Sequence, residues 1–156
     1  MSRMKDLYKG PLYIASDHAG FRLKNRIVRY IQNELHLEVQ DLGPTEYNPN
    51  DDYPDYIIPL AQKVRETQGR GIVVCGSGIG ACIAANKVAG IRCGIGYNSE
   101  VAESMMQHDN TNVLALAGGT LSENHAKLIV KTWLMNNFTD EERHVRRLDK
   151  IARLEE

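Results

Sequence analysis

Short aliphatic runs alternate along this chain with longer amphipathic segments, and this alternation restricts the fold more than any other feature. The runs predict strands at 12–16, 37–42, 71–75, 91–96 and 113–117. Between them, apolar residues recur at three- and four-residue spacing, which predicts helices. Alternating strands and helices require a parallel sheet with helices on both faces. We therefore expect an α/β fold: a three-layer, doubly wound, Rossmann-like sheet of five parallel strands.

The length of 156 residues fits a single domain, spanning 1–156 and ending in a helix at about 140–155. The formal net charge of −1 leaves no basic field, so we expect no nucleic-acid partner. No apolar run approaches the roughly 18 residues of a membrane span, and residues 1–11 lack the apolar core of a signal peptide. We therefore expect a cytoplasmic protein with no membrane partner.

The cysteines are odd in number and have no metal-ligand spacing; they are Cys75, Cys82 and Cys93. This pattern indicates free thiols and predicts no metal site. Cys82 falls inside a predicted helix and Cys93 inside a predicted strand, so both are interpreted as packing residues.

In doubly wound sheets, ligands bind beyond the carboxyl ends of the strands. This rule selects the segments 17–18, 43–54, 75–80, 97–98 and 118–119. The polar, proline-containing segment 43–54 is too short for a domain linker and long enough for a functional loop.

The most informative segment is a strand-to-helix turn made of Cys75, Gly76, Ser77, Gly78, Ile79 and Gly80. Its glycines permit close backbone approach, and the amide N–H groups at the helix start form an anion site. Such a turn could bind a dinucleotide, a phosphate or an enolate oxygen. The glycine spacing matches neither the dinucleotide fingerprint nor the P-loop, which disfavours nucleotide binding.

Cys75 lies beside the predicted helix N-terminus, a position that stabilises a thiolate. It is therefore a candidate base or nucleophile. The alternative is a buried cysteine that only fills the end of a strand.

The remaining candidates lie in three other segments. Asp17 either caps the next helix or assists catalysis, and His18 beside it could bind phosphate or transfer protons. His108 follows a predicted helix, where it is either a C-terminal histidine or an acid/base group. Arg143 and Arg147, four residues apart, share a helix face that either is simply solvated or clamps a phosphate.

Several segments, in this order, resemble the type B ribose-5-phosphate isomerase family, which includes the galactose-6-phosphate isomerase subunits. They are Ser16-Asp17-His18-Ala19-Gly20-Phe21, Asp52-Tyr53-Pro54, Cys75-Gly76-Ser77-Gly78-Ile79-Gly80, Ala84-Ala85-Asn86-Lys87, Gly90-Ile91-Arg92, His108 to Leu114, and Arg143-His144 with Arg146-Arg147. The resemblance implies interconversion of ribose 5-phosphate and ribulose 5-phosphate in the non-oxidative pentose phosphate pathway, without metal or organic cofactor.

The resemblance also implies a role for each candidate. Cys75 is the general base, Ser77 moves a proton between O1 and O2, and His108 opens the sugar ring with help from Asp17. The amides from Gly76 to Gly80 stabilise the enediolate. The residues that match the phosphate-binding set are His18, Arg143 and Arg147. The family further implies a homodimer or homotetramer with a shared site, to which the C-terminal helix crosses from a partner subunit.

One position indicates the branch of the family, and two others depart from the family pattern. Ala81 stands where one branch of the family has a glutamate base, which favours Cys75 as the base here. Asp109 replaces a sugar-binding amide, and Gly119 replaces a phosphate-binding arginine. Losing that charged contact weakens phosphate binding by about 1.5–3 kcal/mol. Two alternatives therefore stay open: an isomerase of a hexose 6-phosphate such as allose or galactose 6-phosphate, and a non-catalytic sugar-phosphate-binding protein.

Overall fold

All the strands run parallel, in the order β2-β1-β3-β5-β4, in a computed structural model that describes residues 6–156. The strands are β1 (Leu12–Ser16), β2 (Gln40–Asp41), β3 (Arg70–Cys75), β4 (Cys93–Ile95) and β5 (Val113–Ala117). Residues 1–5 of the segment 1–11, for which the sequence predicts no signal peptide, lie outside the described residues. The prediction of a five-stranded parallel sheet is confirmed.

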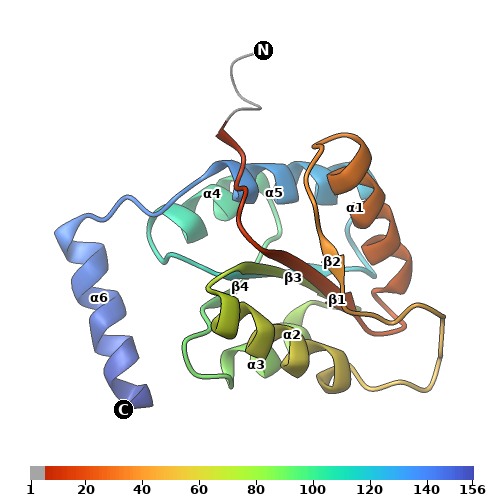
Figure 1. Cartoon of the computed structure of the whole chain (residues 1–156), viewed down its shortest axis with the longest axis horizontal. Helices are drawn as coiled ribbons and strands as arrows, with labels where there is room; N and C mark the ends of the chain where they lie inside the picture. The colour runs from red at the N-terminus through yellow and green to blue at the C-terminus, as the bar shows by residue number, and fades with distance from the viewer. Residues whose placement is uncertain (1–5) are drawn as a thin grey trace.

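Helices cover both faces of this sheet (Figure 1). One face carries α1 (Phe21–Asn33), α4 (Ser99–Gln107) and α5 (Glu123–Met135), and the other carries α2 (Pro54–Thr67) and α3 (Ile79–Asn86). The last helix, α6 (Glu142–Ala152), stands beside the sheet, on the side opposite the loop 43–54 (Figure 1). No helix within residues 6–156 is long and apolar enough to cross a membrane.

Two strands are shorter than the sequence predicts. The segment before β2 is held by α1, because the backbone N–H of Leu37 donates to the carbonyl of Ile31 at 3.0 Å. Before β4, the backbone N–H of Arg92 donates to the side chain of Asn112 at 2.8 Å. Predicted strand 37–42 is therefore reduced to Gln40–Asp41, and predicted strand 91–96 to Cys93–Ile95.

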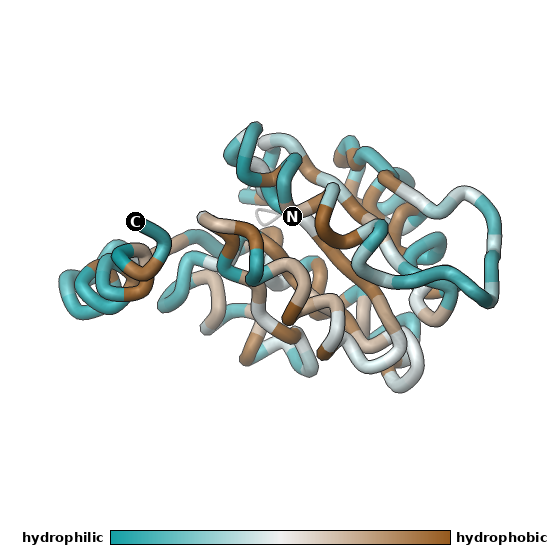
Figure 2. The backbone as a smooth tube through the Cα atoms, turned by 90° about the horizontal axis from the view of Figure 1, so that it is seen from below, coloured by the Kyte–Doolittle hydropathy of each residue, from teal (hydrophilic) through white to brown (hydrophobic). Residues whose placement is uncertain are grey.

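The sheet separates two apolar cores. Alternate residues of the central strands point to opposite faces, so Ile72 and Val74 enter the core under α1, α4 and α5, whereas Val73 enters the core under α2 and α3. Figure 2 shows the apolar residues concentrated along the central strands, while the outer loop 43–54 is mainly hydrophilic. A sheet buried on both faces needs continuous aliphatic strands, which accounts for the uninterrupted runs in the sequence.

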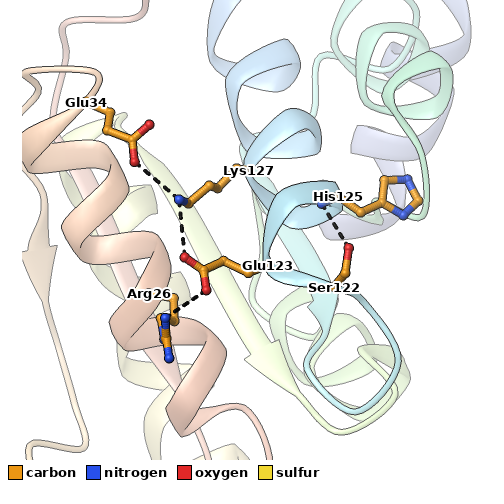
Figure 3. A network of polar contacts seen from close by, with 6 residues as sticks. All are labelled: Arg26, Glu34, Ser122, Glu123, His125 and Lys127. Atoms are coloured by element: carbon orange, nitrogen blue, oxygen red, sulfur yellow. Dashed lines mark hydrogen bonds and ion pairs between the residues drawn. The ribbon is translucent and has the colours of Figure 1, made fainter.

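A surface network ties α1 to α5 (Figure 3). Glu123 accepts from Arg26 at 3.0 Å, and Lys127 lies 3.2 Å from both Glu123 and Glu34. The hydroxyl of Ser122 accepts from a backbone N–H at 3.2 Å and caps the start of α5. These contacts fix the two helices side by side on one face of the sheet.

Candidate active site

The loops that follow β1 and β3 meet where the strand order reverses direction. The chain leaves β1 toward β2 on one side and then crosses from β2 to β3 on the other side of β1, which makes the carboxyl ends of β1 and β3 a topological switch point. Asp17 and His18 follow β1, and the glycine loop 75–80 follows β3. The structure therefore places these two predicted segments at one edge of the sheet.

The glycine loop holds the sulfur of Cys75 against a backbone N–H group. The backbone N–H of Gly78 donates to Cys75 Sγ at 3.2 Å, and the residue is only 4% exposed. Gly78 has a φ of +78°, and a Cβ there would lie 3.2 Å from the backbone of Leu116, so this turn requires glycine. The backbone N–H of Ile79 donates to Ser77 Oγ at 3.2 Å. The loop thus combines a sulfur, a hydroxyl and the N-terminal amides of α3.

The loop after β5 packs directly on this turn. The backbone N–H of Gly118 donates to the carbonyl of Cys75 at 2.7 Å, and that of Gly119 donates to the carbonyl of Gly76 at 2.9 Å. A Cβ at Gly119 would lie 3.0 Å from that carbonyl oxygen. Position 119 therefore contributes backbone to the edge of the site, and no cationic side chain.

His18 is paired with a carboxylate that the sequence did not single out. Asp51 Oδ1 accepts from the backbone N–H of His18 at 2.9 Å and lies 2.6 Å from its Nδ1. The hydrogen bond to Asp51 raises the pKa of His18 above its ordinary value, with Asp17 adding to the effect. Asp51 has a 5% exposed side chain, and its Oδ2 has no hydrogen-bond partner. The pair favours the imidazolium form of His18, which suits an anion ligand.

Asp17 is buried, and its Oδ1 accepts from the backbone N–H of Gly20 at 2.9 Å. The N-cap of α1 is Gly20, without a side-chain cap, so Asp17 stabilises the turn before the helix and does not cap the helix itself. Ligand atoms of Asp17, His18 and Asp51 lie within 4.8 Å of one another, so this group could hold a metal ion. The 2.6 Å contact between His18 and Asp51 is a hydrogen-bond distance. These residues therefore fit an ion pair better than a metal centre.

A buried lysine anchors the loop that carries Asp51. Lys24 is fully buried, and its Nζ donates to both carboxylate oxygens of Asp41, at 2.9 and 2.7 Å, and to the carbonyl of Pro44 at 2.8 Å. Asp41 also accepts from the backbone N–H of Gly43 at 2.9 Å. The start of loop 43–54 is thereby fixed to α1 next to the site.

His108 lies at the opposite edge of the sheet from Cys75. Helix α4 starts beyond the carboxyl end of β4 and runs back, and His108 is its C-cap residue. Four residues later, the carbonyl of Asn112 accepts from the backbone N–H of Gly71 near the start of β3. His108 and Asp109 are both exposed at this amino-terminal edge. Within one chain, the structure does not bring them to Cys75.

Helix α6 joins His108 at the same edge. The imidazole rings of His108 and His144 stack with centroids 4.6 Å apart and an interplanar angle of 8°. Burial lowers the pKa of His144, and the charge of Arg143 lowers it further. Arg143 and Arg147 are exposed, and Arg143 Nε donates to Glu141 at 2.9 Å. The candidate residues therefore form two half-sites, one at each edge of the sheet.

Sequence patterns carried no signal for Asp51 or for the stacking partner of His108. Asp51 lies in a polar loop without periodicity, and its pairing depends on how that loop folds back over β1. The stacking of His108 on His144 depends on where the chain turns after α5. The remaining histidines, His36 and His125, are exposed and receive no role.

The chain is similar to known proteins over most of its length. Residues 12–151 match the family model described as Ribose/Galactose Isomerase. The chain is 40% identical over 146 residues to a probable ribose-5-phosphate isomerase B of Mycoplasma genitalium, covering 92% of this chain and 95% of that protein. It is 41% identical over 144 residues to the putative sugar phosphate isomerase YwlF of Bacillus subtilis, covering 92% and 95%.

Solved structures give the same result. The crystal structure of ribose-5-phosphate isomerase B from Mycoplasma genitalium with bound ribulose-5-phosphate superposes with a TM-score of 0.88 at 40% identity, covering 93% of this chain and 95% of that one. Ribose-5-phosphate isomerase B of Clostridium thermocellum also gives a TM-score of 0.88, at 39% identity, covering 93% and 97%. The similarity extends over the sheet, both helical layers and the glycine loop.

Proposed function

The chain belongs to the ribose/galactose isomerase family and is an isomerase, and on this premise we propose that it interconverts ribose 5-phosphate and ribulose 5-phosphate. One observation carries the proposal. A buried thiol sits inside a turn of backbone N–H donors, across the switch point from Asp17 and His18. This arrangement supplies a base and an anion site next to His18, a side chain that can bind a phosphate in its cationic form.

Cys75 acts as the base in the proposed mechanism. Its thiolate removes the C2 proton of the open-chain aldose, and the resulting thiol returns a proton at C1. Ser77 transfers the hydroxyl proton between O2 and O1. The amides of the loop, together with the N-terminus of α3, stabilise the negative charge of the cis-enediolate. Neither a metal nor an organic cofactor has a step in this scheme.

Ring opening and part of the phosphate binding require groups from the other edge of the sheet. We propose that a second copy of the chain supplies them, in a homodimer or a tetramer built from it. His108 of one subunit would act as the ring-opening acid/base at the Cys75 site of the other. Arg143 and Arg147 on α6 would add to His18 in binding the phosphate. The separation of the two half-sites within one chain supports this arrangement.

Complementation between two inactive variants tests both the reaction and the shared site. Cys75→Ala and His108→Ala chains are each expected to be inactive alone. Random pairing of equal amounts makes about half of the dimers mixed, and each mixed dimer has one intact site of two. The mixture should therefore regain about one quarter of the wild-type activity. Mixed dimers purified through two different affinity tags should show the recovery directly. Mixed dimers without activity would contradict the shared site.

A hexose 6-phosphate remains the second candidate substrate. The glycine at position 119 leaves the edge of the site beside Gly76 without a side chain, and Asp109 can accept hydrogen bonds from additional sugar hydroxyls. The ratio of kcat/KM for ribose 5-phosphate to kcat/KM for allose and galactose 6-phosphates decides between them. A ratio below one would reverse the assignment.

A non-catalytic sugar-phosphate-binding protein is the alternative of another class. Such a protein would bind ribose 5-phosphate in calorimetry and show no turnover, an outcome that the combination of Cys75, Ser77 and His108 disfavours.

We place the reaction in the cytoplasm and in the non-oxidative pentose phosphate pathway. Three free cysteines fit a reducing compartment.

A further inference from the structure

The two cysteines outside the proposed mechanism are in contact. Cys82 lies on α3 and Cys93 is the first residue of β4. Cys82 Sγ lies 3.4 Å from the carbonyl oxygen of Cys93, and both side chains pack against the same apolar core, under α2 and α3. This packing is as the sequence predicts, and each side chain stays partly exposed.

Asn86 contacts both cysteines. Its Oδ1 accepts from the backbone N–H of Cys93 at 2.8 Å, and its Nδ2 donates to the carbonyl of Cys93 at 3.0 Å. The same Nδ2 lies 3.5 Å from Cys82 Sγ. One side chain on the last turn of α3 therefore connects the helix to β4 beside the sulfur of Cys82.

The two thiols are chemically unequal. The neighbouring Cys93 lowers the pKa of Cys82 to about 7, whereas Cys82 and burial together raise the pKa of Cys93 well above its ordinary value. Cys82 is therefore the more acidic thiol of the two. A nucleophilic thiolate beside a protonated thiol is the arrangement of a redox-active cysteine pair.

We propose that Cys82 and Cys93 form a peroxide-reactive dithiol that closes reversibly into a disulfide. The Cys82 thiolate attacks one oxygen of a peroxide, the O–O bond breaks, and the leaving hydroxide takes a proton to become water. Cys93 then attacks the sulfenic sulfur of Cys82, the S–O bond breaks, and a second water leaves with the thiol proton. Two thiols are oxidised and one peroxide is reduced to two waters. A thiol reductant reverses the change.

The disulfide would connect α3 to β4 close behind the glycine loop. The backbone N–H of Cys82 donates to the carbonyl of Gly78 at 3.0 Å, and Gly78 in turn donates to Cys75 Sγ. Drawing the two sulfurs to bonding distance shifts the first turn of α3 and the turn that holds Cys75. We therefore expect oxidation to lower the isomerase activity, a consequence that rests on the proposed function.

Peptide mass spectrometry tests the disulfide independently of activity. The wild-type chain is treated with hydrogen peroxide, the free thiols are alkylated, and the protein is digested without reductant. The expected product is a linked peptide pair containing Cys82 and Cys93 that disappears after dithiothreitol. Cys75→Ser should form the same link, and Cys82→Ser should form none. A link through Cys75, or two cysteines that oxidise without linking, would overturn the proposal.

Activity measurements separate the effect of the link from damage to Cys75. After peroxide is removed with catalase, the wild type should lose most of its activity and regain it with dithiothreitol. Cys82→Ser, under the same dose, should keep its own starting activity. Equal loss in both proteins would assign the effect to Cys75 and refute the coupling of the disulfide to the site. An inactive chain that still forms the link would refute the proposed function alone.

Discussion

His18 and Asp51 are 33 residues apart in the chain and 2.6 Å apart at Nδ1 and Oδ1. A second hydrogen bond, from the backbone N–H of His18 to the same carboxylate oxygen at 2.9 Å, fixes their relative orientation. The ring of Tyr47 meets the His18 ring edge-on, with centroids 6.4 Å apart. The pair links the loop after β1 to loop 43–54 and favours the charged form of His18 beside the proposed site.

Replacing Asp51 by Asn keeps the shape of the side chain and removes its charge. The pKa of His18 should fall, and KM for ribose 5-phosphate at neutral pH should rise on the order of five- to tenfold with kcat little changed, as expected for weakening one charge-assisted hydrogen bond. Asp55→Asn, on the exposed start of α2, is the matched control. An unchanged KM in Asp51→Asn would show that Asp51 does not act through His18.

The pH dependence of KM follows from the raised pKa of His18. The imidazolium form is fully present below the unfolded value of 6.5 and disappears as the pH rises through the higher folded value, so both phosphate binding and the stabilisation from the Asp51 pair decline over that range. KM of the wild type should therefore rise toward alkaline pH. In Asp51→Asn the rise should begin at lower pH, and superimposable profiles would contradict this.

Lys24→Met tests the anchor of loop 43–54. The substitution keeps most of the buried volume but leaves Asp41 and the carbonyl of Pro44 without their donor. We expect the free energy of unfolding to fall by about 1–3 kcal/mol in urea titrations. KM should also rise, because the same loop carries Asp51. Arg26→Met, which removes an exposed ion pair on the same helix, should have a smaller effect on both quantities.

Cys75→Ala tests the base. With the thiol removed, kcat should fall by about 10²–10⁴-fold, the usual contribution of a positioned acid/base group, while ribose 5-phosphate still binds in calorimetry. Exchange of the C2 proton with solvent, followed by nuclear magnetic resonance in deuterium oxide, should stop. Cys82→Ala, a thiol removed from the same side of the sheet, should keep proton exchange. Wild-type exchange in Cys75→Ala would eliminate the thiolate mechanism.

His144→Phe tests the docking of α6 on His108. The pKa of His144 is lowered, so the stabilisation from its neutral form is present above 6.5 and is lost as the pH falls through the folded value. The wild type should therefore lose more stability between about pH 7.5 and about pH 5.5 than His144→Phe, which keeps the aromatic stack without a titrating group. Thermal denaturation at both pH values measures this. His125→Phe, at an exposed position, should behave like the wild type.

Regular elements with many buried residues were predictable from periodicity. Strands 12–16 and 113–117 have the predicted bounds, because alternate residues of each strand are buried in the two cores. The predicted strands 37–42 and 91–96 were too long at both ends, most of all at their starts. There, single hydrogen bonds to Ile31 and Asn112 replace the sheet pairing, and no periodic pattern reports such bonds.

The sequence by itself determined the sheet, its parallel direction and the placement of Asp17, His18 and Cys75 at one edge, because the carboxyl ends of parallel strands must meet there. Only the tertiary structure decided which side chains pair: His18 with Asp51, Lys24 with Asp41, Cys82 with Cys93 and His108 with His144. It also decided that His108 lies at the opposite edge from Cys75. These contacts join segments with no common period, so their geometry exists only once the loops and the last helix pack against the folded sheet.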